Sequence, residues 1–503
     1  MRTAWCTLSA LSLLLIANVV SASDLRLVEA VKQKNKSAVR ALLKQRVDVN
    51  TPQGDGATAL HWAAHWDDLE TVELLLAARA NVNAANDLKI TPLALASVNG
   101  NTAVIEKLLG AGADTEMASE SGVTPLMLAA RTGKVAAVRA LLAHEAKVNA
   151  KESDRHQTAL MWAVVQQHHE VVQALLERGA DVHARTQTRP TMVMLDQGPR
   201  RIVKRSPEVG TILEMGGSTA LMFAAQVGDI ESAKLLLLAG ARVNDTAADG
   251  KSPLVMAVFA GHGAFASYLL EAGADANAAE AGYSALHAAV LRGNLNVVNA
   301  LLANGANPNS QITKGSRVNR FGSQWALPNT LVGATPLFLS ACYLEVDIMR
   351  ALLARGADPR HGLKDGVTPL LVAAGIEIEK QNRPSERVER GDADQEFGRT
   401  AGPESRVVET LQLLLNAGAD VNGPNQAGDT ALHAAAAGGL TTVIQLLADR
   451  GAKLDAKNQS GQTPLSLTTG GGAQGQRGGG GPPRPSPRLK DAEDLLRKLG
   501  ATN

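Results

Sequence analysis

A short segment that begins at Thr58 and reads Thr-Ala-Leu-His-Trp-Ala-Ala returns, with variation, ten more times along the chain. Most copies follow the previous one at a spacing of roughly 33 residues, and three follow after much longer gaps. A fixed period of this size indicates one supersecondary unit copied many times, and the longer gaps indicate three insertions. Because each copy in such a chain contacts only its neighbours, added length means more copies rather than separate cores. The later copies begin at Thr91, Thr124, Thr158, Thr219, Ser252, Ser284, Thr335, Thr368, Thr430 and Thr463.

The positions within one copy predict two helices joined by a turn. The opening Thr or Ser is a helix N-cap, and Pro follows it in six copies at the first helical position, where its missing N–H is not needed. Leu comes next in all eleven copies, and a pair of small residues such as Ala129 and Ala130 lets neighbouring helices approach closely. A second amphipathic run, such as residues 72–76, then ends at a Gly that can adopt a left-handed conformation.

This pattern of helix, turn, helix and β-turn resembles the ankyrin repeat family. The stretches at residues 58–70 and 157–163, the insertion before residues 218–225, and Trp325 ahead of residues 333–336 resemble more narrowly the long secreted bacterial ankyrin-repeat proteins. The resemblance implies an all-α repeat solenoid, a curved stack of about 12 repeats capped at both ends and interrupted by three insertions. It implies no reaction.

Three copies lack the Gly that ends the second helix. Arg46, Arg79 and Glu145 stand in its place, and all three lie in the N-terminal third. A non-Gly residue in a left-handed conformation costs on the order of 1 kcal/mol. We therefore expect the N-terminal third to be locally less stable than the rest, unless its two tryptophans offset the cost.

The N-terminal segment, 1–22, predicts a cleaved signal peptide. Arg2 gives a positive start, the stretch 8–20 is apolar, and Val20-Ser21-Ala22 forms a small-residue cleavage site. The apolar run is shorter than the roughly 20 residues of a membrane span, and no second span follows. We expect an exported chain, periplasmic or secreted, without a transmembrane segment after maturation and monomeric.

The charge balance and the cysteine content argue against a nucleic-acid binder and against an internal disulfide. Loss of the segment 1–22 would remove one base and leave 49 basic and 49 acidic residues, which argues against a nucleic-acid binder. Of the two cysteines, Cys6 lies in the predicted signal and Cys342 in a first helix. One remaining Cys forms no internal disulfide, and we expect Cys342 to be a buried small hydrophobic residue.

The copies and the gaps between them predict the domain organisation. After the signal peptide we expect a capping repeat at 23–54, ankyrin repeats at 55–183, 217–306, 334–374 and 407–469, and a capping helix at 489–503. The predicted interruptions are a basic insertion at 184–216, a second basic insertion at 307–333, a charged insertion at 375–406 that splits a repeat, and a flexible Gly/Pro-rich segment at 470–488. Residues 191–195 and 210–213 are candidate short strands of an extended hairpin.

No motif predicts catalysis, a metal site or a cofactor. The sequence holds no P-loop, dinucleotide fingerprint, Gly-x-Ser-x-Gly or His-Glu-x-x-His. His61 and His65 stand four positions apart, a spacing that can hold a metal, but His61 occupies a position of the repeat that usually bonds neighbouring backbone. His168 and His169 are expected to face solvent, and Asp67 and Asp68 are explained by helix capping.

The sequence thus favours a non-catalytic protein-interaction scaffold of the bacterial cell envelope, with an unknown protein partner. The alternative is a binder of an anionic envelope ligand, a polysaccharide or phospholipid, through the two basic insertions. An enzyme built from the insertions is the least favoured, because about 30 residues is too little for a catalytic domain. Tryptophan and arginine are enriched at interface hot spots, so the candidate partner-binding residues are Trp66, Arg200, Arg201, Arg317, Arg320, Phe321 and Trp325.

Overall fold

The computed structural model describes residues 24–194, 210–314, 331–376, 404–469 and 487–502. The chain divides into two compact units, residues 1–184 and 185–503. Within the described residues the chain forms 24 helices and one pair of strands. The prediction of an all-α repeat solenoid is therefore confirmed.

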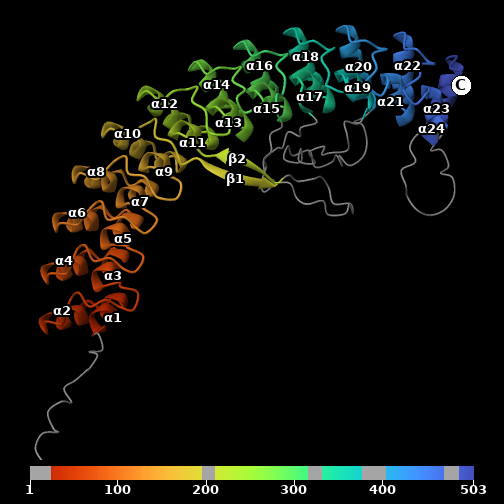
Figure 1. The fold of residues 1–503 in the computed structure, drawn as a ribbon. Coiled ribbons are helices and arrows are strands. Elements are labelled where there is room, and N and C mark those ends of the chain that lie inside the picture. The colour runs from red at the N-terminus through yellow and green to blue at the C-terminus, as the bar shows by residue number, and fades with distance from the viewer. Residues whose placement is uncertain (1–23, 195–209, 315–330, 377–403, 470–486, 503) are drawn as a thin grey trace, which may run out of the picture. The chain divides into compact units, whose positions relative to one another are not determined.

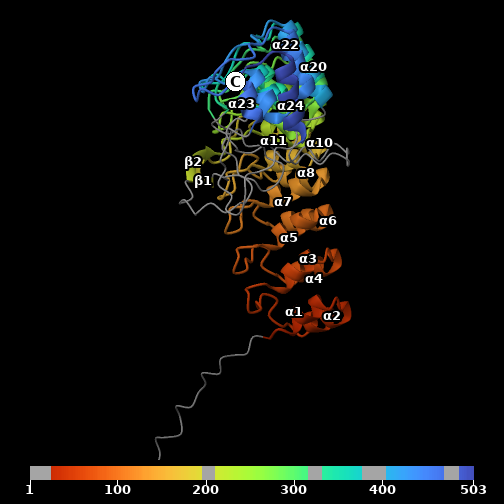
Figure 2. The same cartoon turned by 90° about the vertical axis from the view of Figure 1, so that its right-hand side faces the viewer.

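The first unit consists of five helix pairs. The first helix of each pair is an inner helix and the second an outer helix, and Figures 1 and 2 show the five inner helices in one row beside the five outer helices. The inner helices are α1 (Arg26–Lys32), α3 (Ala59–His65), α5 (Pro92–Asn99), α7 (Pro125–Thr132) and α9 (Ala159–Val165). The outer helices are α2 (Lys36–Lys44), α4 (Leu69–Ala77), α6 (Thr102–Gly110), α8 (Val135–Ala143) and α10 (His169–Glu177).

The second unit opens with two strands and continues with helix pairs. β1 (Arg189–Met194) pairs antiparallel with β2 (Gly210–Met215), with Arg189 opposite Met215, so the predicted hairpin is confirmed. The inner helices are α11 (Ala220–Val227), α13 (Pro253–Ala260), α15 (Ala285–Leu291), α17 (Pro336–Cys342), α19 (Pro369–Ala374), α21 (Ala431–Gly438) and α23 (Pro464–Thr468). The others are α12 (Ile230–Leu238), α14 (Gly263–Glu271), α16 (Leu295–Ala303), α18 (Val346–Ala354), α20 (Glu404–Asn416), α22 (Thr441–Asp449) and α24 (Pro487–Lys498).

The opening Thr or Ser of each copy starts an inner helix as the sequence predicts. Thr91 has extended backbone geometry and its hydroxyl accepts a hydrogen bond from the Ala94 N–H at 3.1 Å. Pro92 is the first helical residue and Leu93 is buried. Each copy therefore begins with a satisfied helix N-terminus and directs its Leu into the core.

A ladder of asparagine side chains joins successive repeats. Asn83 donates to the Gly112 carbonyl at 3.1 Å and accepts from the Asp114 N–H at 2.8 Å. Asn149 makes the same pair of bonds with Gly179 and Asp181. Because one side chain satisfies a donor and an acceptor of the next repeat, the ladder fixes the register of stacking. The second unit uses Asn244, Asn277, Asn309 and Asn422 in the same way.

Left-handed residues other than Gly are concentrated in the first unit. Arg46, Arg79 and Glu145 have φ angles of 60°, 69° and 61°, so they adopt the conformation that the missing Gly would have taken. Five more non-Gly residues of this unit have positive φ, whereas Leu344 alone does so among the described residues of the second unit. Each such residue carries a conformational cost that Gly would not. The five are Lys34, Asp67, Lys89, His156 and Gln167.

Replacing Arg46 or Arg79 by Gly should raise the stability of the first unit by about 1 kcal/mol each. The measurement is hydrogen exchange at the amides of α2 to α4. The matched control is Ala41→Gly, which places Gly inside α2 at an exposed position and should lower stability by about 0.5–1 kcal/mol. Unchanged protection in R46G and R79G, or slower exchange in the wild-type first unit than in residues 404–469, would contradict the expected asymmetry.

Cys342 differs from the prediction. It lies at the end of α17 and is half-buried rather than buried. The last residue of an inner helix faces the turn between the two helices, whereas the buried face is formed by residues such as Leu337 and Ala341. No helix of the described residues is both long and apolar enough to cross a membrane.

Candidate partner-binding surface

The inner helices of the first unit present a line of large apolar side chains. Trp62, Leu95, Leu128 and Trp162 occupy the same position of four successive inner helices, and all four are half-buried. Three positions later in the repeat, Val98 and Val165 are 42% and 37% exposed. We call these six residues the apolar stripe. Because successive repeats stack, each position of one inner helix lies next to the equivalent position of the following one. Trp62, Leu95, Leu128 and Trp162 therefore form one continuous line.

An aromatic cluster marks the first end of the stripe. The ring centroids of Trp62 and Trp66 lie 6.3 Å apart, and the His65 ring lies 4.7 Å from that of Trp66. The Lys34 Nζ lies 4.2 Å from the Trp66 ring centroid, and the Lys32 Nζ lies 5.2 Å from the Trp62 ring centroid. These are cation–π distances, so the lysines of the first repeat pack on the tryptophans of the second.

A similar arrangement is found at the last end of the stripe. The Arg131 guanidinium lies 5.7 Å from the Trp162 ring centroid, and the Trp162 indole donates to the Gln157 side chain at 3.1 Å. The Trp62 indole donates in the same manner to Gln53 at 3.2 Å. Both tryptophans are therefore held in orientation by a glutamine of the turn that precedes their inner helix, with a cation from the preceding repeat on the ring.

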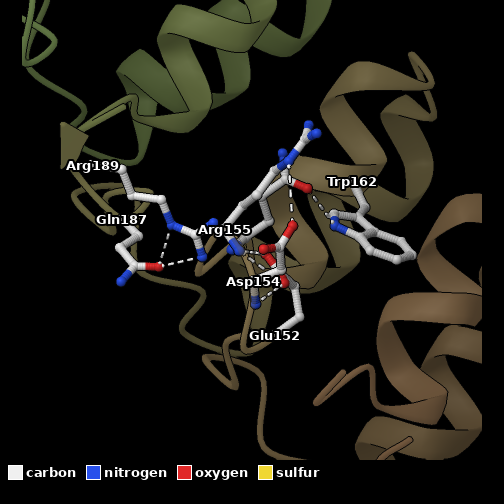
Figure 3. Close-up of polar contacts among 7 residues, drawn as sticks. Glu152, Asp154, Arg155, Trp162, Gln187 and Arg189 are labelled. Atoms are coloured by element: carbon white, nitrogen blue, oxygen red, sulfur yellow. Dashed lines mark hydrogen bonds and ion pairs between the residues drawn. The ribbon is translucent and has the colours of Figure 1, made fainter. Parts of the chain in front are cut away.

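The turns that precede the inner helices, the fingertip turns, form the edge of this surface. In the fourth of these turns Glu152 is buried, and its carboxylate accepts from the backbone N–H groups of Asp154, Arg155 and Gln157 at 2.6 to 3.0 Å (Figure 3). Backbone hydrogen bonds link neighbouring turns, from the Asp87 N–H to the Asp55 carbonyl at 3.0 Å and from the Ser153 N–H to the Ser121 carbonyl at 2.8 Å. The edge is thus preorganised.

In the second unit, arginines of the predicted basic insertion are engaged within the fold. Arg185 donates to the carbonyls of Gly217 and Thr246 at 2.8 and 2.7 Å and pairs with Asp245 at 3.2 Å. Arg189 donates to the Gln187 side chain at 2.7 and 2.9 Å, as Figure 3 shows. Arg185 therefore stabilises the second unit by joining segments within it.

The histidines of the repeated segment serve structure, as the sequence predicts for His61. Its Nε2 donates to the Ile90 carbonyl at 2.9 Å, and its Nδ1 accepts from the Thr58 N–H at 3.0 Å. Burial lowers the pKa of His61, and more strongly that of His287, which falls to about 4. A ring held neutral between a donor and an acceptor has no lone pair left for a metal. In the ranges that the structure describes, no cluster of metal-ligating side chains occurs.

The prediction for His168 needs correction. It is half-buried, and its Nε2 hydrogen-bonds the Arg131 carbonyl of the preceding repeat at 3.1 Å. His262 bonds the Gln226 carbonyl in the same manner at 3.0 Å. Both histidines stand just before an outer helix and satisfy a carbonyl at the end of the neighbouring inner helix. His169 is exposed, as expected.

Of the predicted partner-binding residues, the structure describes Trp66. It is 39% exposed at the end of α3, beside the apolar stripe. The other six lie outside the described residues, and their role stays a prediction: Arg200, Arg201, Arg317, Arg320, Phe321 and Trp325.

Sequence reasoning missed most residues of this surface, including Leu95 and Leu128, which stand in the two repeats between the tryptophans. Val98 and Val165 were not singled out, although their place three positions after Leu95 and Trp162 is a helical spacing that exposes both positions on one face. Lys34 and Arg131 were also missed, and the only sequence feature that could have identified them is the spacing of the repeat. Each stands about one repeat before the tryptophan on which it rests.

Comparisons with known proteins agree with this geometry. A family described as ankyrin repeats (3 copies) matches residues 27–119, 93–186, 217–312 and 404–471, together more than half of the chain. Residues of this chain are 29% identical over 252 positions to the nuclear factor NF-kappa-B p105 subunit of Gallus gallus, covering 45% of this chain and 21% of that protein. They are 40% identical over 126 positions to protein PhlB of Serratia liquefaciens, covering 25% of this chain and 43% of that protein. The chain thus spans less than half of the length of either relative.

Proposed function

Because the chain belongs to the ankyrin-repeat family, we propose that it is a non-catalytic scaffold of the bacterial cell envelope that binds a protein partner through its inner helices and fingertip turns. Ankyrin repeats generally mediate protein–protein interaction, and proteins of this family are typically non-catalytic. The observation that carries the proposal is the apolar stripe of the first unit with Trp66 beside it. Exposed apolar side chains that adjoin one another mark interaction sites more often than scattered ones do.

The envelope location is supported by the N-terminal sequence. A positive start, an apolar run and a small-residue cleavage site form the pattern of an export signal. The bacterial relative PhlB is compatible with a bacterial setting and adds nothing on location.

The first experiment is expression of the full chain with a C-terminal tag in its own source organism, followed by fractionation. We expect the protein in the periplasm or the medium, with Ser23 as its first residue by mass spectrometry. Recovery in the cytoplasm with the segment 1–22 intact would overturn the envelope proposal.

The second experiment is affinity capture of the same protein after brief chemical crosslinking, with identification of the crosslinked residues. We expect a protein partner crosslinked to inner helices or fingertip turns, and no capture by a denatured sample. Capture that disappears when Arg200, Arg201, Arg317 and Arg320 are changed to Glu would place the specificity in the two basic insertions. A protein that retains only polysaccharide or phospholipid, with retention that weakens steeply with salt, would replace the scaffold by the anionic-ligand alternative.

A further inference from the structure

Exposed large apolar side chains are concentrated in the first unit, where two of them belong to the apolar stripe and Trp66 lies beside it. Among the described residues, six large apolar side chains are exposed, and five of them belong to the first unit. Trp66, Val98 and Val165 stand at the ends of three inner helices, whereas Leu238 is alone on the outer helix α12. The first unit therefore carries most of the exposed apolar side chains, although Leu25 and Leu88 lie outside the stripe and exposed Arg131 stands between Val98 and Val165.

The two edges of the stripe differ in charge. Each inner helix begins after a fingertip turn and ends at the turn that leads to its outer helix, about 11 Å away for a helix of about two turns. The fingertip edge carries exposed charges of both signs, with Asp55, Asp87, Glu120 and Asp154 against Lys89, Lys151 and Arg155. The opposite edge, at the ends of the inner helices, is mainly cationic, with exposed Lys34, Arg131 and Lys134 against exposed Asp67. Among the residues that the structure describes, no carboxylate pairs with any of these three cations.

The spacing of the stripe restricts the shape of a ligand that could follow it. Packed helices lie roughly 8–10 Å apart, so the four repeats from Trp62 to Trp162 span about 24–30 Å. A polyproline II segment rises about 3.1 Å per residue with three residues per turn, so one turn covers about 9 Å. An extended peptide in this conformation presents the same face to each successive repeat. Aromatic grooves are the surfaces on which such segments dock.

We propose that the apolar stripe of the first unit binds an extended acidic peptide, about ten residues long, with an apolar side chain at every third position. The apolar side chains contact Trp62, Leu95, Leu128 and Trp162, one per repeat. Carboxylates at the ends of the peptide pair with Lys34 and Arg131, and these two pairings orient the peptide on the stripe. This inference rests on the proposed binding function and names the chemistry of the partner.

The test uses the full chain and synthetic peptides as probes. The main probe is a fluorescein-labelled peptide of four Pro-Gln-Leu triplets with two glutamates at each end. One control peptide has its four central triplets scrambled, and another carries lysines in place of the glutamates. Fluorescence anisotropy measures binding, and a change in tryptophan emission that shrinks in Trp62→Phe and in Trp162→Phe reports contact at the stripe. We expect the main probe to bind at least tenfold more tightly than either control.

Variants locate the site. Val98→Glu and Trp66→Ala should each weaken binding of the main probe at least tenfold, whereas Leu238→Glu, on the most exposed apolar residue of α12, should leave it unchanged. The double variant K34E/R131E should weaken it by a similar factor, and the lysine-flanked peptide should then bind better than the main probe. The charge-matched control K453E/K457E, on exposed lysines of the second unit, should change nothing.

The outcomes separate this inference from the proposed function. Equal binding of the main and scrambled probes, or equal losses in V98E and L238E, would overturn the peptide specificity even if affinity capture returns a protein partner. Failure of K34E/R131E to reverse the charge preference would overturn the orientation. If the probe binds as expected but affinity capture returns no protein, the stripe is supported as a peptide-binding site and the scaffold proposal is refuted.

Discussion

Acidification from pH 7 to pH 4 should lower the free energy of unfolding by about 3 kcal/mol through His287 alone. This histidine is fully buried in α15, and burial lowers its pKa to about 4. Its Nδ1 accepts from the Ser284 N–H at 3.2 Å and its Nε2 lies 3.3 Å from the Ala334 carbonyl, so the native ring is neutral. Protonation would place a second donor against the Ser284 N–H.

The sign of this pH dependence follows from the number of protons bound by the native and by the unfolded chain. An unfolded histidine has a pKa near 6.5, so between about pH 6.5 and pH 4 the unfolded chain binds a proton that the native chain does not. The stabilisation is fully present above about pH 6.5 and is lost as the pH falls toward 4. The depressed pKa of His61 acts in the same direction in the first unit.

Urea denaturation monitored by circular dichroism at several pH values measures the effect. In His287→Gln the amide can still accept from Ser284 but does not titrate, so the loss between pH 7 and pH 4 should shrink by about 3 kcal/mol relative to wild type. The control His65→Gln changes an exposed histidine and should retain the wild-type dependence. A pH dependence in H287Q equal to that of wild type would contradict the role of His287.

The repeat unit was predictable because each of its positions has a local cause. The Thr58 cap, the buried Leu60 and the left-handed turn at Arg46 depend on interactions within one copy, and one copy can be read from the sequence. The hairpin of β1 and β2 was predictable for the same reason, since alternation and turn residues lie close together in the chain.

The features that were missed depend on contacts between copies. Lys34 rests on Trp66 and His168 reaches the Arg131 carbonyl, and in both pairs the two partners belong to different repeats. Which residues meet depends on how far one repeat is rotated relative to the next, and the spacing of the copies does not contain that rotation. The exposure of Cys342 was misjudged for a local reason, because the last residue of an inner helix faces the turn to the outer helix.

The contact between repeats can be tested at two glycines with the same backbone conformation. Gly240 and Gly250 have φ angles of 93° and 84°. Replacement by Ala at either position therefore carries the conformational free-energy cost of a left-handed backbone. A Cβ at Gly240 would meet nothing within 4 Å. A Cβ at Gly250 would lie 2.5 Å from the carbonyl carbon and oxygen of Glu280 in the next fingertip turn. The two substitutions therefore differ in packing against the neighbouring repeat alone.

Gly240→Ala should lower the unfolding free energy of the second unit by about 1 kcal/mol, the conformational cost. Gly250→Ala should lower it by about 3 kcal/mol or more, because backbone must move and overpacking adds roughly 1–3 kcal/mol. Urea denaturation gives the totals, and hydrogen exchange at the amides of residues 247–284 should show local loss of protection in G250A only. Equal losses in the two variants would mean that neighbouring fingertip turns can separate without cost. The fingertip turns of the second unit would then be deformable, and partner binding in that unit would depend on its inner helices instead.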